Sequence, residues 1–552
     1  MIADIHITEK SFGDKTLMKD VKFSVDDGEK VGVVGRNGVG KSTLFGILSG
    51  KDTDYTGEVI FRRGITVATT AQEHHGLGEQ TVMSYILGGL PEYSKLKKII
   101  DEYPLTMGDN MRKIEEYTQA LERFDQKGFY QVEEKIEREL SNFQLDGYGN
   151  RRISSLSGGQ KRLVEIVKIM HSEAHLALID EPTNHMDYVA KQQFIDWMNS
   201  QPHQAMLIIT HDRDVLGQVD RIVEIKDGQA VSYRGNYDAY LKQNAQATTA
   251  GMNNFEQIEK RIVNLKQKVL DYQRLKEKSR NPGTIQKFKR LENEARAELA
   301  ELSEMEKPTF WIDKESASQL DYKSAERYGK FKSRNIRLSM KDASSRSQHV
   351  LVRAENVAVG IGERILFEDV NIDLREGEAI EIRGRNGAGK TTLIRMILAS
   401  DKSFDGGPVL YSGNIFLDPQ VRIGVYEQEI DEKYLADPLE KAIEKLYMSR
   451  DLSISDTRIR QLLADYLFTD ADRMTPLARL SGGQKARFQI IAMLANDPQL
   501  LVLDEPTNHL DLPSIEELET ALAKYSGAIL YVSHDNYFRE KLGGKVVQIG
   551  AE

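Results

Sequence analysis

Four short, uninterrupted apolar runs stand out in the hydrophobic pattern of the chain. HLALID ends at Asp180 and LLVLD ends at Asp504, while MLIIT and ILYVS end at Thr210 and Ser533. Continuous apolar runs of this length are typical of buried strands in a parallel sheet. The pattern therefore predicts an α/β fold in which the polar residues that end these runs lie at the carboxyl edge of a sheet.

The middle of the chain has a different pattern. Apolar residues recur every three or four positions from Phe255 to Tyr272 and again from Ile285 to Leu302. This spacing predicts two amphipathic helices, and the Pro-Gly sequence between them predicts an antiparallel hairpin with its tip at residues 279–284. With a rise of about 1.5 Å per residue, each arm is expected to be on the order of 40–60 Å long.

Four motifs occur twice in the same order, so the chain contains two homologous domains. The pairs are GRNGVGKST at 35–43 and GRNGAGKTT at 384–392, LSGGQK at 156–161 and at 480–485, DEPTNHMD at 180–187 and DEPTNHLD at 504–511, and THD at 210–212 and SHD at 533–535. We predict a first domain at residues 1–240, a helical hairpin linker at 241–345 and a second domain at 346–552.

The spacing of the repeats indicates an insertion in the first domain. The two copies of the first motif are 349 positions apart, whereas those of the third are 324 apart. The matched residues Gln72 and Gln428 locate the extra residues, because the distance from this glutamine to the LSGGQ motif is longer in the first domain. The first domain therefore has an insertion of roughly 30 residues within about 90–143, where apolar residues have helical spacing. We expect a helical hairpin that projects from the domain; the alternative is a longer loop packed on the same domain.

Composition limits the classes of protein that fit. A chain of 552 residues, 40% hydrophobic and 29% charged, is too long for one core and typical of globular proteins. No apolar run approaches the roughly 18 residues of a membrane span. The N-terminus lacks a signal-peptide pattern, and the chain has no cysteine. We therefore expect a cytoplasmic protein without a membrane partner.

One short stretch contrasts with the acidic balance of the whole chain, whose net charge is -10. Between Arg274 and Arg290 there is a single acid, Glu277. The basic residues that we predict to bind RNA are Arg274, Lys276, Lys278, Arg280, Lys287, Lys289 and Arg290. Such a cluster repels itself unless anions screen it, and RNA phosphate supplies that charge. Tyr272 and Phe288 would add base stacking. The alternative is a solvated charged face.

The first motif fits the phosphate-binding pattern G-x-x-x-x-G-K-[ST] between an apolar strand (30–34) and an apolar helix (43–48). Glycines let backbone N–H groups wrap the phosphates, Lys41 neutralises them and Ser42 ligates magnesium. The predicted nucleotide contacts are Gly35, Asn37, Gly38, Gly40, Lys41, Ser42 and Thr43 in one copy, and Gly384, Asn386, Gly387, Gly389, Lys390, Thr391 and Thr392 in the other.

Paired acids follow two of the apolar strands. Asp180 and Asp504 are predicted to hold magnesium, with the hydroxyls of Ser42 and Thr391 as further ligands. The next residues, Glu181 and Glu505, are placed to orient and polarise the attacking water. The alternative, a solvated strand end, fits poorly with an apolar strand that leads into Asp-Glu-Pro.

Two histidines in register, His211 and His534, follow the other two apolar strands. A lone histidine there is usually structural, but a matched pair argues for contact with the γ-phosphate. Each LSGGQ motif begins a predicted helix, so its N–H groups form a second anion site. The predicted contacts are Ser157, Gly158, Gly159 and Gln160, and Ser481, Gly482, Gly483 and Gln484. A composite site, in which each LSGGQ faces the nucleotide of the other domain, accounts for both anion sites.

Phosphate loop, Gln loop, LSGGQ, DEPTNH and switch histidine together resemble the ATP-binding cassette superfamily over roughly four-fifths of the chain. The resemblance implies two P-loop cassettes that close head to tail on two ATP molecules with Mg²⁺. One implied site combines Lys41, Ser42, Gln72, Asp180, Glu181 and His211 with Ser481 and Gly483. The other combines Lys390, Thr391, Gln428, Asp504, Glu505 and His534 with Ser157 and Gly159.

The resemblance also assigns three further positions. Gln72 and Gln428 would contact both nucleotide and metal, and Phe12 would stack on adenine. The position that matches Phe12 in the second half is Ile361, a departure that implies aliphatic packing of the base at that site. The alternative for Phe12 is an ordinary core residue.

Tandem cassettes, a helical insertion and a hairpin linker together look like subfamily F of this superfamily. That resemblance implies an ATPase that binds the ribosome, with its linker at large-subunit rRNA and the peptidyl-site tRNA. It also implies a monomer whose two cassettes pair with each other. Some members are translation factors and others protect ribosomes from antibiotics, often with a longer tip loop; the short SRNPGT turn favours a translation factor.

Two other classes stay open. A tandem ATPase subunit of a membrane transporter would explain both cassettes but leaves the basic hairpin without a role. DNA-maintenance ATPases have coiled coils, but these are normally inserted within one cassette, which ranks that class last.

Overall fold

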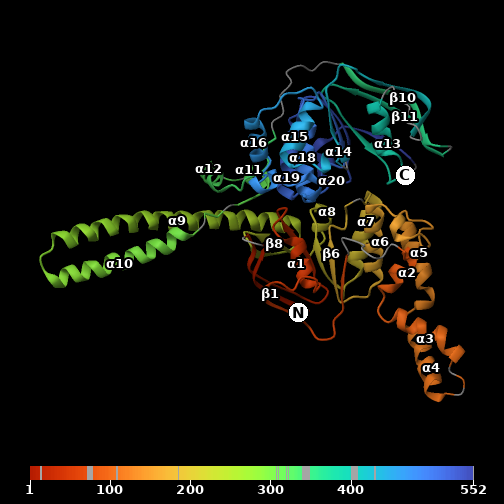
Figure 1. Cartoon of the computed structure of the whole chain (residues 1–552), viewed down its shortest axis with the longest axis horizontal. Coiled ribbons are helices and arrows are strands. Elements are labelled where there is room, and N and C mark those ends of the chain that lie inside the picture. Colours follow the sequence, from red (N-terminus) through yellow and green to blue (C-terminus); the bar gives the residue numbers. More distant parts are fainter. Residues whose placement is uncertain are drawn as a thin grey trace. The chain divides into compact units, whose positions relative to one another are not determined.

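The computed structural model describes residues 1–12, 15–70, 79–106, 108, 110–184, 186–305, 307–308, 310–318, 320, 322–338, 349–362, 364–399, 408–427 and 430–550. These residues form two compact units. One unit combines Met1–Tyr237 with Ile336–Glu552 and contains both repeats, and the other is Asp238–Asn335 (Figure 1). The predicted linker boundary at 240/241 lies three residues beyond the first of these limits, and the predicted boundary at 345/346 lies outside the described residues.

The first cassette contains two sheets. A three-stranded antiparallel sheet has the order β2-β1-β4, from β1 (Ala3–Phe12), β2 (Lys15–Val25) and β4 (Thr56–Phe61). A six-stranded sheet has the order β5-β6-β7-β3-β8-β9, from β3 (Lys30–Gly35), β5 (Val67–Thr69), β6 (Leu176–Asp180), β7 (Ala205–Ile209), β8 (Arg221–Lys226) and β9 (Gln229–Arg234). The apolar runs predicted as buried parallel strands are β6 and β7, and every residue of both is buried.

The second cassette repeats this plan. Its antiparallel sheet has the order β11-β10-β13, from β10 (Val350–Ile361), β11 (Arg364–Arg375) and β13 (Pro408–Leu417). Its parallel sheet has the order β14-β15-β16-β12-β17, from β12 (Ala379–Arg383), β14 (Ile423–Tyr426), β15 (Leu500–Asp504), β16 (Ala528–Val532) and β17 (Lys545–Gln548). The predicted α/β fold with two tandem cassettes is confirmed.

Most helices of the two cassettes also correspond. In the first cassette they are α1 (Lys41–Leu48), α2 (Val82–Gly88), α3 (Tyr93–Thr106), α4 (Met111–Gln126), α5 (Val132–Asn142), α6 (Gly158–His171), α7 (Tyr188–Ser200) and α8 (Arg213–Leu216). In the second they are α13 (Lys390–Ala399), α14 (Glu432–Leu435), α15 (Leu439–Met448), α16 (Asp456–Asp465), α17 (Asp470–Arg473), α18 (Gly482–Leu494), α19 (Leu512–Ala523) and α20 (Asn536–Leu542).

Helices α3 and α4 occupy the predicted insertion, and they lie side by side (Figure 1). Their base is anchored by aromatic packing, since the rings of Tyr93 and Phe129 are 5.2 Å apart and Phe124 packs on both. Helix α5, which also falls within 90–143, instead has a counterpart in α16. The non-repeated element is therefore the α3–α4 pair.

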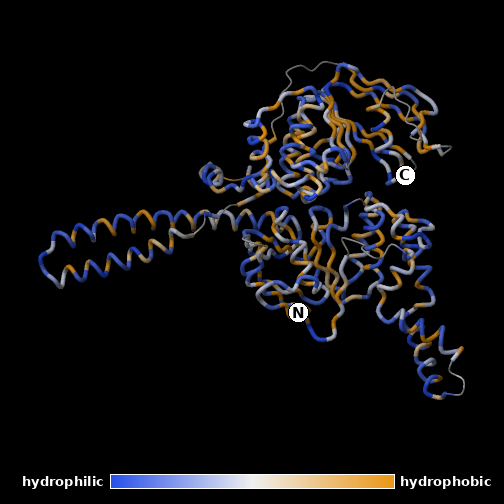
Figure 2. Tube along the Cα trace, viewed as in Figure 1, coloured by the Kyte–Doolittle hydropathy of each residue, from blue (hydrophilic) through white to orange (hydrophobic). Residues whose placement is uncertain are grey.

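The second unit contains α10 (Pro282–Glu304), α11 (Lys314–Ser318), α12 (Tyr322–Phe331) and most of α9 (Tyr237–Lys278). Leu265, Val269 and Ala295 are buried between α9 and α10, as the seam predicts. The turn is shorter than the predicted tip at 279–284. The side chain of Asn281 accepts a hydrogen bond from the N–H of Gly283, and Pro282 begins α10, so only residues 279–281 lie outside the helices. The residues around this tip are mostly hydrophilic (Figure 2).

Candidate functional site

Each phosphate loop holds a buried lysine against its own backbone. Lys41 Nζ donates to the carbonyls of Gly35 at 2.6 Å and Arg36 at 3.2 Å. Lys390 Nζ makes the same two contacts, to Gly384 at 2.8 Å and Arg385 at 3.1 Å. Burial lowers the pKa of both lysines, although nearby acids oppose the shift. A bound phosphate would supply the counter-charge that a buried ammonium needs.

The loops require glycine where the backbone turns back on itself. Gly40 has a φ of 107° and Gly389 a φ of 99°, both in the left-handed region that glycine adopts without strain. A Cβ atom added at these positions would lie within 3.0 Å of the side chain of Leu17 or of Phe367. These glycines therefore shape the loop that presents its N–H groups.

A hydroxyl and a carboxylate meet at the start of each loop helix. Ser42 Oγ donates to Asp180 Oδ2 at 3.2 Å, and Thr391 Oγ1 donates to Asp504 Oδ2 at 2.8 Å. Asp504 Oδ1 is buried and has no hydrogen-bond partner in the part of the chain that the structure describes. Within the described ranges, no three His, Cys, Asp or Glu side chains gather as a metal site. The donor set suits Mg²⁺, which uses one or two protein oxygens and takes its other ligands from water and phosphate.

A glutamate and a histidine face each other beside each loop. His211 Nε2 is 3.6 Å from Glu181 Oε1, and His534 Nε2 is 3.4 Å from Glu505 Oε1. Both histidine Nε2 atoms are buried without a hydrogen-bond partner among the described residues. Burial raises the pKa of each glutamate to about 7 and lowers the pKa of each histidine to about 3. The histidines are therefore neutral, and the glutamates can take up a proton near neutral pH.

Both glutamates have strained backbones. Their φ angles are 47° for Glu181 and 52° for Glu505, in a region that non-glycine residues rarely adopt. Each N–H donates to the neighbouring strand, at 2.7 Å to the carbonyl of Ile209 and at 3.0 Å to that of Val532. Such strain costs about 1–3 kcal/mol and concentrates at functional sites. The matched strain in both cassettes supports a catalytic position for these residues.

The raised pKa of Glu181 and Glu505 predicts a pH dependence. A carboxylate accepts a proton only when ionised, so the rate of ATP hydrolysis is expected to rise with pH through about 7. One unit below the pKa about a tenth of the base is ionised, which predicts a roughly tenfold lower kcat near pH 6. Steady-state kcat measured from pH 5.5 to 8.5 tests this, and a kcat that is flat from pH 5.5 to 7.5 would contradict it.

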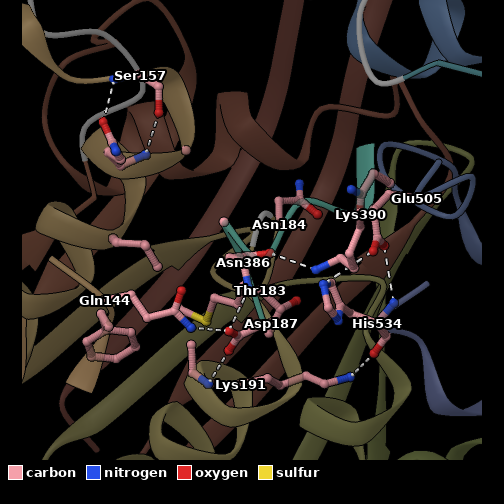
Figure 3. Close-up of a pocket in the computed structure, with 18 of the residues that line it drawn as sticks. Gln144, Ser157, Thr183, Asn184, Asp187, Lys191, Asn386, Lys390, Glu505 and His534 are labelled. Atoms are coloured by element: carbon pink, nitrogen blue, oxygen red, sulfur yellow. Dashed lines mark hydrogen bonds and ion pairs between the residues drawn. The ribbon is translucent and has the colours of Figure 1, made fainter. Parts of the chain in front are cut away.

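Residues from both cassettes line one cavity of about 950 Å³. The first cassette contributes Ser157, Gly159 and Gln160 from its LSGGQ motif, and the second contributes Lys390 and Thr391 from its phosphate loop. Ser157 and Lys390 lie on opposite sides of this cavity (Figure 3). Space for a ligand therefore opens between the LSGGQ of one cassette and the phosphate loop of the other, as a composite site requires.

The opposite pair of motifs is in direct contact. Asn37 Nδ2 donates to the carbonyl of His509 at 2.8 Å, and a Cβ atom added at Gly483 would lie 2.1 Å from the same nitrogen. Gly483 therefore has to be glycine for the first phosphate loop to approach the second LSGGQ motif this closely.

The hydroxyls of the LSGGQ motifs are engaged as helix caps. Ser157 Oγ accepts from the N–H of Gln160 at 3.3 Å, and Ser481 Oγ accepts from that of Gln484 at 3.3 Å. In return, each glutamine Oε1 accepts from the serine N–H at 2.9 Å. This capping box aligns the N-termini of α6 and α18, where Gly158 and Gly482 are the first helical residues.

Two aspartates that the sequence did not single out join the cassettes. Asp187 Oδ2 accepts a hydrogen bond from the N–H of Asn386 at 3.1 Å, and Asp511 Oδ2 accepts one from the N–H of Asn37 at 3.1 Å. Each aspartate ends a DEPTNH-x-D motif and caps the helix that follows. The repetition of this aspartate in both copies was the available signal.

The remaining predicted nucleotide contacts divide into two groups. Gln72 and Gln428 lie outside the described residues. Phe12 is 57% exposed with Lys10 Nζ 4.7 Å from its ring, and Ile361 is 51% exposed and lines the cavity. Exposure at the end of β1 contradicts the core alternative for Phe12.

Most of the predicted RNA contacts are exposed at the hairpin tip. Arg274, Lys278, Arg280, Lys287 and Lys289 are exposed, whereas Lys276 pairs with Glu292 at 2.6 Å and Arg290 with Glu294 at 2.9 Å. The rings of Tyr272 and Phe288 stack on each other with centroids 6.3 Å apart. That mutual stacking joins α9 to α10 and occupies ring faces that the sequence interpretation assigned to bases.

Comparisons with known proteins agree with this geometry. The family described as ABC transporter matches residues 18–184 and 367–508, more than half of the chain. The putative ATP-binding protein YdiF of Bacillus subtilis is 29% identical over 100% of this chain and 80% of its own length.

Two further relatives carry functional names. The ribosome protection protein VmlR of Bacillus subtilis is 27% identical over 96% of this chain and 83% of its own length. The energy-dependent translational throttle protein EttA of Mycobacterium tuberculosis is 27% identical over 96% of this chain and 88% of its own length.

Among solved structures, an archaeal ribosome recycling factor in complex with a ribosomal stalk protein matches 99% of this chain and 87% of its own. Its TM-score is 0.60 at 16% identity, a likeness of fold.

Across the described parts of the chain, no helix combines the length and the apolar character that crossing a bilayer requires.

Proposed function

Because the chain belongs to the ABC transporter family and is an ATPase, we propose that it is an F-type member that acts on the ribosome. In this proposal ATP binding holds the two cassettes together while the tip of the α9–α10 hairpin contacts RNA near the peptidyl-site tRNA. Hydrolysis then separates the cassettes and releases the chain. The observation that carries the proposal is the set of exposed basic side chains at that tip.

The residues of each cassette support a division of labour in hydrolysis. Lys41 and Lys390 bind the terminal phosphates with ammonium groups that donate to the backbone carbonyls of their own loops, to which Lys390 adds a contact with Asn386 Oδ1 at 3.4 Å. Glu181 and Glu505 orient a water and accept its proton, and neutral His211 and His534 hold the γ-phosphate through Nε2.

The acids that follow β6 and β15 fit a magnesium ion. Asp180 with Ser42 and Asp504 with Thr391 would hold it, and Asp504 Oδ1 has the free lone pairs that a ligand needs. Bound there, Mg²⁺ would neutralise charge on the β- and γ-phosphates. Both sites have the same residues for hydrolysis, so we propose that both turn over.

Co-sedimentation with purified ribosomes tests the proposal. The full chain carrying Glu181→Gln and Glu505→Gln is expected to pellet with ribosomes in the presence of ATP and to remain in the supernatant with ADP. A matched variant carrying Glu122→Gln and Glu540→Gln, at exposed positions, should behave as the unmodified chain. If the first variant stays in the supernatant with ATP, the proposed ribosomal function is wrong.

The basic tip predicts a separable effect on RNA binding. Replacing Lys278, Lys287 and Lys289 with alanine is expected to weaken ribosome binding and to reduce the slope of log affinity against log salt by about one per lysine. ATP hydrolysis without ribosomes should not change, because these side chains belong to the hairpin. Binding titrations at several salt concentrations measure both quantities.

A matched control for the tip comes from the same hairpin. Lys260, Lys266 and Lys268 are exposed on α9 away from the turn, so their replacement removes equal charge at another place. Equal weakening by both triple variants would show that net charge, and not the tip, governs binding.

Within the F type, a translation factor is the favoured role. Only residues 279–281 separate α9 from α10, and a turn this short lacks the longer tip loop that ribosome protection is expected to use. The likeness to VmlR keeps ribosome protection as the second candidate. Growth of cells with and without the gene, on a panel of large-subunit antibiotics, decides between these roles.

A further inference from the structure

Lys191 is a buried lysine of α7 that belongs to neither phosphate loop; only 4% of it is exposed. Its Nζ donates to Asp214 Oδ2 at 2.6 Å and lies 3.2 Å from Asp212 Oδ2, both in the same cassette. A third contact crosses to the other cassette, where Nζ donates to the backbone carbonyl of His534 at 2.8 Å (Figure 3). Three oxygens thus surround one buried ammonium. Burial by itself would lower the pKa of Lys191, but the carboxylates of Asp212 and Asp214 more than offset this effect and raise it.

The same cluster holds the second cassette at another point. Asp214 Oδ2 also accepts a hydrogen bond from Asn536 Nδ2 at 2.8 Å. The segment of the second cassette from His534 to Asn536 is therefore held through one backbone carbonyl and one side chain. Because these two atoms belong to the residues on either side of Asp535, the position of the whole 534–536 segment depends on the first cassette.

This segment leads directly to the catalytic glutamate of its own cassette. The N–H of His534 donates to Glu505 Oε2 at 3.2 Å, and His534 Nε2 is 3.4 Å from Glu505 Oε1. A continuous line of contacts therefore runs from Lys191 through the backbone of His534 to the carboxylate. A displacement of the histidine carbonyl would move the N–H and ring that fix Glu505.

The repeat shows that the opposite site is built differently. With the register of the DEPTNH motifs, the residue that matches Lys191 is Ile515, and with the register of the switch histidines, Tyr537 matches Asp214. Ile515 is apolar and lies in the core of the second cassette, so it has no group to donate to the His211 carbonyl.

A different contact joins the cassettes near His211. Arg213 Nη1 donates to Glu519 Oε1 at 2.8 Å. In the repeat, Asn536 matches Arg213 and Ile195 matches Glu519, so the matching residues cannot form this ion pair. That ion pair begins two residues beyond His211 and involves a side chain, whereas Lys191 holds the backbone of His534 itself.

We propose that Lys191 is a positioning residue for ATP hydrolysis at the second site alone, the site formed by Lys390, Glu505 and His534. The first cassette thereby controls the geometry of hydrolysis in the second, and among the described residues no equivalent contact acts in return. The two sites share the same catalytic residues but are not equivalent. This inference rests on the ATPase activity and is independent of the proposed ribosomal function.

The test uses the full chain with one hydrolytic site at a time. Glu181→Gln leaves the second site active and Glu505→Gln leaves the first. Adding Lys191→Ile is expected to lower kcat by about tenfold in the Glu181→Gln chain, with the KM for ATP within about threefold, since displaced catalytic groups mainly cost turnover. In the Glu505→Gln chain kcat should change by less than about twofold.

Three further variants separate positioning from general damage. Lys191→Ile combined with Asp214→Tyr gives the first cassette the residues that the second has at the matching positions. Because Asp214 is removed together with the lysine, no second unpaired carboxylate is left beside Asp212. This double variant should show the same selective loss. Lys191→Arg keeps a cation that can donate to the same carbonyl and should restore most of the rate. Arg213→Asn removes an inter-cassette ion pair of comparable burial and should not lower turnover of the second site.

Each result of these experiments either supports or overturns the proposed role of Lys191. Loss confined to the second site, with recovery by Lys191→Arg, supports the proposal. Equal loss in both single-site chains, no loss at the second site, or a second-site loss with Arg213→Asn would overturn it. If neither single-site chain turns over, vanadate trapping of 8-azido-ATP on the Lys191→Ile chain replaces the kinetics. Mass spectrometry then counts labelled peptides from each cassette, and unchanged labelling of the second cassette would overturn the proposal.

Discussion

Replacing Glu181 and Glu505 together with glutamine is expected to lower the rate of ATP hydrolysis by about 100-fold or more, because general-base catalysis contributes about 10²–10⁴-fold. Each carboxylate lies beside its switch histidine, and burial brings its pKa to about 7, the range in which a base is most effective near neutral pH. An amide has the same size but cannot accept the proton of the attacking water.

Binding of ATP should survive this change. The phosphate contacts come from the loops that begin α1 and α13, so the affinity for ATP is expected to stay within about threefold, as for the loss of an interaction made only in the transition state. Steady-state hydrolysis and binding of a fluorescent ATP analogue measure the two quantities. The Glu122→Gln and Glu540→Gln chain, which loses the same charge at exposed positions, is the control.

Two results would contradict the assignment of these glutamates. The first is a double variant that retains more than about a tenth of the rate, since a general base is worth far more than that. The second is a parallel loss of ATP affinity and hydrolysis, which would place both residues in nucleotide binding. The single variants add a further test, because each leaves one complete glutamate–histidine pair.

Much of the catalytic core follows from local sequence. The apolar runs that end at Asp180 and Asp504 form fully buried strands, and such a strand can present its next residue only at the sheet edge. The phosphate loops are equally local, because Gly40 and Gly389 need left-handed backbone angles that glycine provides. Chemistry fixed by the residue and its immediate neighbours is therefore visible without a structure.

Contacts between the cassettes were harder to foresee. Asp187 and Asp511 each end a DEPTNH-x-D motif of one cassette, yet each accepts a hydrogen bond from the phosphate loop of the other. Residues this far apart in sequence meet only through docking of two surfaces. The same holds for Lys191, since nothing in its local sequence distinguishes a lysine buried in a cluster of acids from a lysine exposed on a helix.

The hairpin shows how a cap can override a turn pattern. The Pro-Gly sequence predicted a tip that included Thr284, but Asn281 caps α10 and Pro282 occupies its first position. Proline is well suited there, because the first helical N–H needs no partner inside the helix. Tyr272 and Phe288 were predicted to meet bases, but their seam positions bring the two rings together.

Replacing Lys41 and Lys390 together with methionine is expected to weaken ATP binding by about 10–100-fold at each site. A hydrogen bond to a charged group contributes about 1.5–3 kcal/mol, and each 1.4 kcal/mol is tenfold in affinity. Methionine keeps the apolar stem that fills the loop but has no ammonium group for the phosphates. Isothermal titration with a non-hydrolysable ATP analogue measures the affinity.

The folded chain should tolerate this change, because the buried ammonium is not a source of stability without nucleotide. Burial lowers the pKa of both lysines, which means that the surroundings disfavour the charged form until phosphate arrives. The melting temperature without ATP is therefore expected to stay within a few degrees of the unmodified chain, while the rise on adding ATP should largely disappear. A chain with Lys51→Met and Lys524→Met, both exposed, should keep that rise. A double variant at Lys41 and Lys390 that still melts at a higher temperature with ATP would show that the loop backbone alone holds the phosphates.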